Sequence, residues 1–375
     1  MKVTQLVICA LAFFVAVHAT SRIRHPRWHQ LDGYTFEQYM EDHNKAYRAS
    51  ELQMRRALFE KNVQRVNAHN ADSSKSWKMG INHLSDWTEE EFRATLGYDK
   101  ELGFHQMSKR AQVVSDEDID ISGIPTNWDW RTQGVISDVK DQGRCGSCWT
   151  FGAAETIESH YAIQTGFLQD LSQQQIIDCI PNALQCGGTG GCQGGTAELV
   201  FETLVQTTGG LASEWTYPYR SYYADNFTCQ YDPLKTKAAA SITGHVVLPS
   251  NQYAPVMKAL ATVGPLAVNV DASSWSFYES GVYTACDAEN VDIDHVVQLV
   301  GYGTDEQYGD YWTVRNSWGP KYGEKGYIRL ARSSDVKCGV DKTPLDGTGC
   351  AGGPSTQTVC GACGILFDVS YPKIL

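Results

Sequence analysis

Three side chains of the types that cooperate in nucleophilic catalysis are Cys148, His295 and Asn316. Cys148 opens an apolar segment, 148–164, that predicts a helix, and a thiol at a helix N-terminus has a lowered pKa because it feels the positive end of the helix dipole. A thiolate also needs an imidazolium within hydrogen-bond reach and a third group that orients the ring. His295 and Asn316 follow downstream in predicted strands, and a neutral amide can orient an imidazole without adding charge. This set therefore predicts a Cys–His nucleophilic site.

Two other interpretations of these residues remain open at this point. Cys145 and Cys148 form a Cys-x-x-Cys pair, which is also typical of thioredoxin-like redox proteins. That reading needs a βαβ context, which the predicted elements lack. His295 taken alone fits an ordinary core histidine equally well, so the prediction depends on the whole set.

The elements that must position these residues come in the order helices first and strands later. Predicted strands separated by Gly and Asp turns cover 265–272, 295–303, 310–319 and 326–332. This order favours an α+β domain in two lobes over a βαβ repeat. Residues 20 to about 100 show helical spacing, with capping-box patterns at 50–53 and 88–91. Residues 97–123 turn polar and contain Lys109-Arg110, which predicts a domain boundary and a cleavage site.

Export to an oxidising compartment is expected from the N-terminus and the cysteines. The apolar run Leu6 to Val17 follows Lys2, is too short to span a membrane, and precedes a small-residue cleavage site after Ala19. A retained signal anchor is the alternative. The chain has 12 cysteines, of which Cys9 lies in this signal, so an odd number remains and one should stay free. The formal net charge of −12 argues against a nucleic-acid partner.

Five segments in the right order resemble the papain-like cysteine peptidases, and in particular the cathepsin L-like group. They are CGSCW at 145–149, DHVVQLVGYG at 294–303, RNSWG at 315–319 and two N-terminal motifs described below. The resemblance implies an α+β, papain-like two-lobed domain with a helical left lobe and a β-barrel-like right lobe, preceded by a small helical propeptide domain. It makes Cys148 the nucleophile, His295 the general base and then acid, Asn316 the orienting group, Gln142 the oxyanion-hole side chain and Trp318 a shield against water.

The resemblance also implies how a substrate would be held. Gly194 and Gly195 would let an extended substrate backbone run alongside, although the same loop could be only a disulfide turn. The pocket for the second residue before the scissile bond would be lined by Thr196, Ala197, Asn269, Ile293, Asp294, Val296 and Asp368. Asp368 matches the position at the pocket floor where an acidic residue admits a basic side chain. We therefore expect tolerance of Arg beside apolar residues; a solvated surface Asp is the alternative.

The N-terminal segment resembles the inhibitory propeptide of these enzymes. One helical stripe carries the ERFNIN-type motif, with Val66 in place of Ile: Glu51, Arg55, Phe59, Asn62, Val66 and Asn70. A G-x-N-x-F-x-D-type motif follows, with Leu84 in place of Phe: Gly80, Asn82, Leu84 and Asp86. The resemblance implies a segment that runs backwards through the cleft, is removed at acid pH, and leaves a mature N-terminus near Ile121 to Ile124, unless another protease cuts at Lys109-Arg110.

Three disulfides are implied by the resemblance: Cys145–Cys192, Cys179–Cys229 and Cys286–Cys363. The partners of Cys186, Cys338, Cys350 and Cys360 cannot be read from the sequence. A zinc site made by Cys360 and Cys363 with Cys338 and Cys350 is the alternative, but a secreted chain favours disulfides. The Cys/Gly-rich insertion at about 340–361 has no counterpart in the resemblance. Asn226 opens an N-glycosylation sequon.

The sequence thus predicts a signal peptide at 1–19, an inhibitory propeptide at 20–121 with a helical core at about 35–95, and a papain-like peptidase domain at 122–375. We expect a secreted or lysosomal zymogen of a cysteine endopeptidase that acts through a Cys148 thioester. Exopeptidase action is disfavoured, because no histidine-bearing insertion lies between Cys179 and Cys192. No cofactor or metal and no membrane span are expected. The resemblance implies polypeptide substrates, cystatin-like inhibitors and a monomer; a secreted binding or inhibitory protein is the alternative class.

Overall fold

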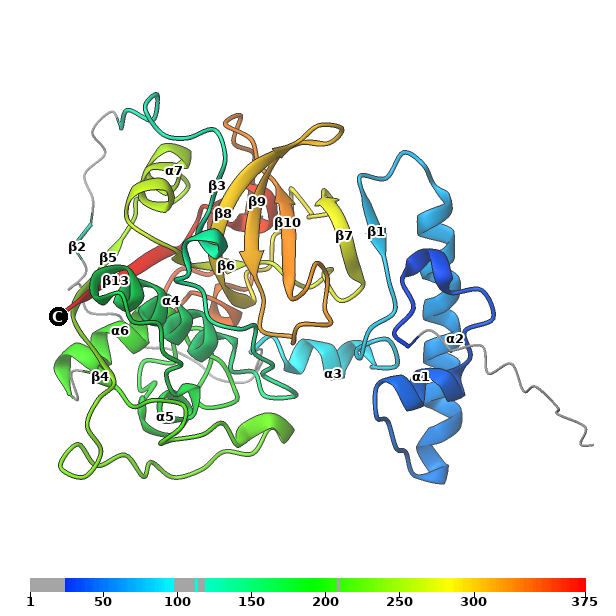
Figure 1. Cartoon of the computed structure of the whole chain (residues 1–375), viewed down its shortest axis with the longest axis horizontal. Helices are drawn as coiled ribbons and strands as arrows, with labels where there is room; N and C mark the ends of the chain where they lie inside the picture. The colour runs from blue at the N-terminus through cyan, green and yellow to red at the C-terminus, as the bar shows by residue number, and fades with distance from the viewer. Residues whose placement is uncertain (1–23, 98–111, 114–118, 208–209) are drawn as a thin grey trace, which may run out of the picture.

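The computed structural model describes residues 24–97, 112–113, 119–207 and 210–375. The predicted signal peptide and the Lys109-Arg110 pair lie outside these ranges. Two bodies are visible in Figure 1: a helical unit at one end, formed by the N-terminal residues, and a larger body of helices and sheet that holds the C-terminus. Within the described ranges, no helix combines the length and apolar character needed to cross a membrane.

The N-terminal unit is built on a long helix. Its elements are η1 (Trp28–Gln30), α1 (Phe36–Asp42), α2 (Ala49–Ala71), β1 (Trp77–Met79) and α3 (Glu89–Ala94). The capping box predicted at 88–91 is present: Thr88 caps α3, and the Glu91 side chain accepts from the Thr88 N–H. The one predicted at 50–53 is wrong, because α2 begins earlier, at Ala49, with Arg48 as N-cap and no side-chain cap.

The residues of the two propeptide motifs hold this unit together. Phe59 packs with Phe36 and Tyr39 in a separate aromatic cluster, which is worth about 1.5–3 kcal/mol for each buried ring. Other motif side chains bond across the unit: Arg55 to Glu91 and to Asp86 O, Asn62 to Ser85 O, Asn70 to Met79, and Asp86 to Tyr39, Tyr47 and Lys45. Val66 and Leu84 are buried, and Glu51 lies half-buried in the first turn of α2.

The larger body contains four further helices and four 3-10 turns among its described residues. They are η2 (Trp130–Gln133), α4 (Cys148–Thr165), α5 (Gln173–Cys179), α6 (Ala197–Gln206), η3 (Ser221–Tyr223) and α7 (Tyr253–Thr262), followed by η4 (Pro344–Asp346) and η5 (Ala362–Gly364). Helix α4 is buried around most of its circumference, as its apolar sequence predicts. Helices α5 and α6 pack against one side of α4, and the sheet packs against its other side.

A mixed sheet forms the second lobe. Besides β1, its strands are β2 (Gln112–Val113), β3 (Trp128–Asp129), β4 (Gly210–Leu211), β5 (Ala240–Val247), β6 (Leu266–Val270), β7 (Tyr278–Tyr283), β8 (His295–Asp305), β9 (Gly309–Arg315), β10 (Tyr327–Ala331) and β13 (Val369–Ile374). The strand order is β1-β7-β10-β9-β8-β6-β13-β5-β2, and outside this order β3 pairs with β8 and β4 pairs with β5. A separate hairpin, β11 (Cys338–Asp341) and β12 (Gln357–Cys360), lies within the insertion. The predicted strands at 265–272, 295–303, 310–319 and 326–332 are all present.

The N-terminal unit docks on this sheet through shared backbone and core. Strand β1 pairs antiparallel with β7, and Asn82 donates to Ser276 O at 2.7 Å. Gly80 packs directly against Glu279: a Cβ there would lie 2.0 Å from a carboxylate oxygen and 2.9 Å from the Cβ atom of Glu279, so a larger residue requires the Glu279 side chain to move. Trp77 and Leu96 join the same apolar core as the sheet residues. The helical unit and the sheet therefore form one packed structure.

Candidate active site

Cys148 is the first residue of α4, and its thiol is almost completely buried. It is 2% exposed and is the only cysteine outside a disulfide in the described part of the chain. Helix α4 approaches β8 closely at Gly152, where a Cβ would lie 2.7 Å from the Val296 Cγ1 atom. Backbone N–H groups at the start of α4 and at Val296 face the thiol and favour its ionised form. The fold thus places Cys148 beside the residue that follows His295.

His295 begins β8 and is oriented by Asn316, which follows β9. Its Nε2 lies 2.8 Å from Asn316 Oδ1, and both side chains are buried. The other ring nitrogen, Nδ1, is buried and has no hydrogen-bond partner among the described residues. The centroid of the Trp318 ring lies 5.0 Å from that of the imidazole, and the Trp275 ring lies edge-on with a centroid distance of 6.4 Å. The Asn–His pair is therefore enclosed by two indoles, which exclude water and leave Nδ1 for proton exchange.

Gln142 presents its amide nitrogen to the same site. Its Nε2 donates to Cys145 O at 2.8 Å, and Ser317 Oγ donates to its Oε1 at 2.6 Å. Backbone pairing with Ser317 also anchors the Gln142 segment. The amide plane is thus fixed before any ligand arrives, as a preorganised oxyanion donor requires.

The last residues of the N-terminal unit that the structure describes before the gap at 98–111 lie inside this site. Thr95 O accepts from Gln142 Nε2 at 2.7 Å, and Leu96 O lies 4.0 Å from Cys148 Sγ. Gly97 then runs beside Gly194, since a Cβ on Gly97 would lie 3.1 Å from the Gly194 Cα atom. All three residues of this segment are buried. The propeptide backbone therefore occupies the positions next to the thiol and the amide donor.

Burial keeps both reactive groups neutral in this form. It raises the pKa of the Cys148 thiol to about 12, although the backbone N–H of Val296 opposes the shift. Burial also lowers the pKa of His295 to about 4, although the bond to Asn316 opposes it. A neutral thiol beside a neutral imidazole is a weak nucleophile.

Part of the expected pocket gathers at the junction of β6, β8 and β13. Asn269 is paired with Val296 in the sheet register, and its Nδ2 donates to Asp368 Oδ2 at 3.0 Å. Burial raises the pKa of Asp368, and the negative charge of Glu198 adds to the shift. Ala197 is buried in the same cluster as Val296 and Cys148. The carboxyl groups of Asp368 and Glu198 therefore lie near each other at this junction.

Three other expected lining residues use their side chains elsewhere. Thr196 caps α6 through a bond from the Leu199 N–H to its Oγ1. Ile293 packs into an apolar cluster with Val291 and Val359 of the insertion. The Asp294 carboxylate accepts from the Ala272 N–H at 2.9 Å. The printed partners of these three side chains thus lie outside the group formed by Asn269 and Asp368.

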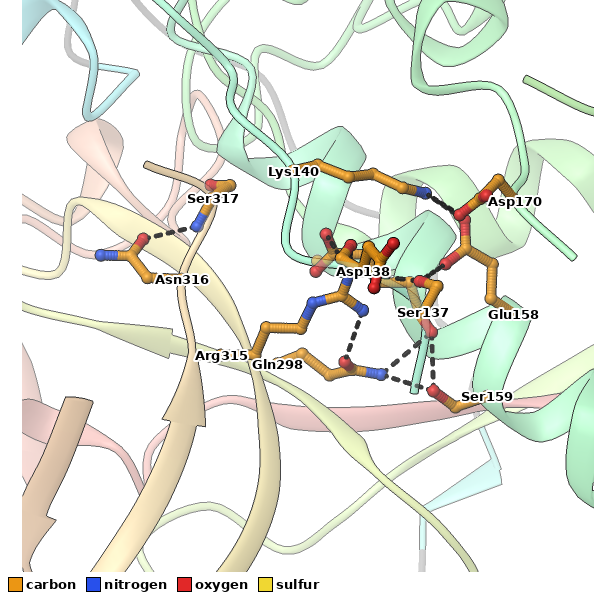
Figure 2. Close-up of polar contacts among 12 residues, drawn as sticks. Ser137, Asp138, Lys140, Glu158, Ser159, Asp170, Gln298, Arg315, Asn316 and Ser317 are labelled. Carbon is orange, nitrogen blue, oxygen red and sulfur yellow. Dashed lines mark hydrogen bonds and ion pairs between the residues drawn. The ribbon is translucent and has the colours of Figure 1, made fainter. Parts of the chain in front are cut away.

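A buried ionic network, which sequence reasoning missed, supports the strand that carries Asn316 (Figure 2). Arg315 is fully buried; its guanidinium bonds Ser137 Oγ at 3.1 Å and pairs with Glu155 of α4 at 3.3 Å. Gln298 of β8 donates to Glu155 O and Ser159 Oγ, each at 2.9 Å. The network therefore links the helix that holds the thiol to the strands that hold His295 and Asn316.

All the cysteines of the described ranges except Cys148 are bridged. The three pairs implied by the resemblance, Cys145–Cys192, Cys179–Cys229 and Cys286–Cys363, are formed. Two further pairs, Cys186–Cys350 and Cys338–Cys360, use the cysteines that the sequence left unassigned. No cluster of potential metal ligands is found in the described ranges. Asn226 lies exposed in a loop, and its Oδ1 accepts from the Cys192 N–H at 2.9 Å.

Other contacts of this site were also missed. Ser317, which holds Gln142, lies within the RNSWG segment, and Glu198 directly follows Thr196 and Ala197. Their proximity to residues already singled out was the available signal. Nothing in the sequence signals Trp275 beside His295.

Comparison with known proteins gives concordant results. Residues 124–348 match the papain family cysteine proteases, and residues 36–92 match the cathepsin propeptide inhibitor domain (I29). Procathepsin L of Mus musculus is 38% identical over 324 residues, which are 84% of this chain and 92% of that protein. Fruit bromelain of Ananas comosus is 35% identical, with coverages of 83% and 84%. The structure of digestive procathepsin L2 proteinase from Tenebrio molitor larval midgut has a TM-score of 0.72 and 32% identity, over 90% of this chain and 98% of that one.

Proposed function

Because the chain belongs to the papain family of cysteine proteases and is a cathepsin L-like endopeptidase zymogen, we propose that Cys148, His295, Asn316 and Gln142 hydrolyse peptide bonds once the propeptide leaves. The observation that carries this proposal is the pair of propeptide carbonyls at the site: Gln142 Nε2 donates to Thr95 O at 2.7 Å, and the next carbonyl oxygen, Leu96 O, lies 4.0 Å from Cys148 Sγ. The amide donor and the thiol therefore both face peptide backbone, as they would face a substrate. The Asn316-held imidazole beside it supplies the base.

Acylation begins with transfer of the Cys148 proton to His295 Nδ1. The thiolate sulfur attacks the substrate carbonyl carbon, and the electron pair of the C=O bond moves to oxygen. The Gln142 Nε2–H and the Cys148 backbone N–H stabilise this oxyanion. When the carbon–nitrogen bond breaks, the imidazolium donates its proton to the leaving amine. The product is a Cys148 thioester.

Deacylation repeats these roles with water as the nucleophile. His295 takes a proton from the water as its oxygen attacks the thioester carbon, and the oxyanion again lies at Gln142. The carbon–sulfur bond breaks, and the thiolate regains an imidazolium partner. Asn316 Oδ1 holds the ring through Nε2–H in both steps, and Trp318 shields that bond.

The propeptide would inhibit by lying backwards in the cleft. Its chain passes from Gln142 to Gly194, whereas the family resemblance places the amino-side part of a substrate along Gly194 and Gly195. A chain of reversed polarity does not present its bonds for cleavage in the productive direction. Residues 98–111 lie outside the described ranges, so this proposal rests on Thr95 to Gly97.

Acid activation is supported by an ion pair inside the propeptide. The Arg55 guanidinium lowers the pKa of Glu91 to about 2 from 4.5. Because the folded-state pKa is depressed, this carboxylate stabilises the unit above about pH 4.5, and that contribution is lost as the pH falls towards 2. Acid therefore loosens the helix that leads into the cleft. The new N-terminus would form near Ile121 to Ile124.

For the second substrate residue we propose tolerance of Arg beside apolar side chains. The support is the pair of carboxyl groups, Asp368 and Glu198, next to the Asn269 amide. The test compares Phe-Arg and Arg-Arg peptide amides with the wild type and Asp368→Ala. Unequal losses, with the Arg-Arg peptide losing more, would support the pocket assignment; equal Phe/Arg ratios in both enzymes would refute it.

We also place the zymogen in the secretory pathway, with a lysosomal or extracellular destination. Five disulfides in the described chain are typical of an oxidising compartment, and the sequon residue Asn226 lies exposed. The enzyme would act as a monomer and bind cystatin-like inhibitors, as the family resemblance implies.

Expression of the zymogen beside Cys148→Ala tests the core of the proposal. Both would be incubated at pH 4, where the Glu91 contribution has begun to be lost, with a mild reductant, and peptide hydrolysis and product masses would be followed. Activity that rises as the propeptide disappears, and that is absent from Cys148→Ala, is the expected result. A folded, processed chain that reacts with an epoxide thiol reagent but hydrolyses nothing would favour a binding or inhibitory protein instead.

A further inference from the structure

The insertion joins the two walls of the substrate cleft. It starts on the wall that leads to His295: β11 runs beside Asn290, and Thr343 Oγ1 donates to Asp292 Oδ1 at 2.8 Å. Val359 of β12 packs on Val291 and Ile293 in the same wall. The Cys338–Cys360 disulfide closes the base of this hairpin. We call residues 343–353, which lie within the connection between these two strands, the strap.

The strap ends on the opposite wall, in the loop that leads to Gly194 and Gly195. Gly349 O accepts from the Gly187 N–H at 2.9 Å, and Leu184 O accepts from the Ala351 N–H at 3.1 Å. The Cys186–Cys350 disulfide fixes this end covalently. Cys350 is 4% exposed, so the attachment is packed as well as bonded.

Gly347 marks the crossing point between the walls. A Cβ on Gly347 would lie 1.7 Å from Ile293 O, so its backbone lies directly against the His295 wall. On the other side, a Cβ on Gly187 would lie 2.1 Å from Gly347 O and 3.1 Å from Gly195 O. The buried Gly347 backbone therefore lies between the Ile293 carbonyl and the loop of Gly187, close to the Gly195 carbonyl, and narrows the cleft at this point.

This position determines how far a substrate can extend. Under the proposed function, on which this inference rests, the second residue before the scissile bond lies along Gly195, with its side chain towards Asn269 and Asp368. The strap backbone lies against Gly187, close to the carbonyl of the same Gly195. We propose that the strap ends amino-side recognition at the second substrate residue, so that the preferred bond follows the second residue from a peptide's amino terminus. Internal bonds are cleaved only when the substrate chain turns out of the cleft at its third residue.

A length series of peptides tests this proposal. The activated enzyme is given Phe-Arg-aminocoumarin amide with a free amino terminus and the same peptide extended by one or two N-terminal Gly residues. We expect kcat/KM to fall by about tenfold or more on the first extension, because the added residue meets the strap. An equal or rising kcat/KM with length overturns the proposal.

Release of the strap gives the matched comparison. Cys186→Ser with Cys350→Ser frees its end from the glycine-loop wall, and Cys338→Ser with Cys360→Ser breaks only the base. The first variant should recover about tenfold in kcat/KM for the extended peptides and leave the dipeptide amide within about threefold, whereas the second should keep the wild-type length dependence. Equal behaviour of both variants overturns the proposal.

The outcomes separate this inference from the proposed function. If no peptide is cleaved although Cys148 is titratable, the proposed function fails and the inference falls with it. If all lengths are cleaved equally, the proposed function stands and the strap has no role in specificity. The wild-type series decides the question even where a cysteine variant does not fold.

Discussion

Replacement of Phe92 by Ala should expose the catalytic thiol of the intact zymogen. Phe92 lies on α3, is 6% exposed, and packs edge-on against Trp318 at 5.3 Å. Truncation of a buried Phe to Ala costs about 3–5 kcal/mol. Part of the Phe92 surface is buried inside the propeptide itself, so we assign about 2 kcal/mol to the docking contact. That value corresponds to about 30-fold more molecules with the propeptide displaced.

Alkylation of Cys148 measures this population directly. With its pKa raised to about 12, the docked thiol is almost entirely protonated at pH 7 and unreactive, so labelling proceeds through displaced molecules. The other cysteines of the described chain are bridged and should not react under non-reducing conditions. We expect the labelling rate of Phe92→Ala zymogen to rise by about 30-fold over that of the wild type.

A matched variant controls for general loosening of the propeptide. Met54 lies on α2 and is 42% exposed, so Met54→Ala removes a side chain of similar size away from the peptidase. Its zymogen should be labelled at the wild-type rate. If Phe92→Ala is also labelled at the wild-type rate, the contact between Phe92 and Trp318 does not hold the propeptide in place and the reasoning is refuted.

Three further predictions concern the site and its supports. Gln142→Ala should lower kcat by about 10²–10³-fold, and Ser317→Ala by less, because Ser317 only orients the amide; unchanged kcat in both would remove Gln142 from the mechanism. Burial raises the pKa of Glu155 from 4.5 to about 7 against the opposing charge of Arg315, so stability is lost as the pH rises through this window. Glu155→Gln should therefore show a smaller drop in melting temperature between pH 4.5 and 7.5 than the wild type, and an equal drop would exclude Glu155 as its source. Asn62→Ala should destabilise the zymogen by about 1 kcal/mol through loss of a bond to the loop after β1 and leave the mature enzyme unaffected, as differential scanning calorimetry of both forms can test.

Local patterns in the sequence predicted the main elements of the site well. The apolar run from Cys148 became α4, and the strand of His295 appeared where alternating and β-branched residues stand. The capping box at Thr88 was predictable because all its partners lie within one turn. At Ser50 the same pattern misled, since the chain continues helically back to Ala49.

Long-range features were beyond such patterns. Cys186 and Cys350 are separated by 164 residues, and only the folded chain brings them together. The Asp294 carboxylate accepts from the Ala272 N–H, 22 residues away, which no local pattern signals. The buried pair of Arg315 and Glu155 likewise depends on how α4 crosses the sheet. Sequence periodicity identifies which face of a helix or strand is buried, whereas these contacts depend on which buried faces pack against each other.

The pairing of β1 with β7 means that proteolytic maturation changes the edge of the sheet. In the zymogen, Trp77 to Met79 satisfy the backbone groups of β7 on the side opposite β10. When the propeptide leaves, β7 becomes an edge strand with unpaired N–H and C=O groups. The mature enzyme thus gains a second surface able to bind an extended polypeptide by main-chain hydrogen bonds, in addition to the cleft that cleaves substrates.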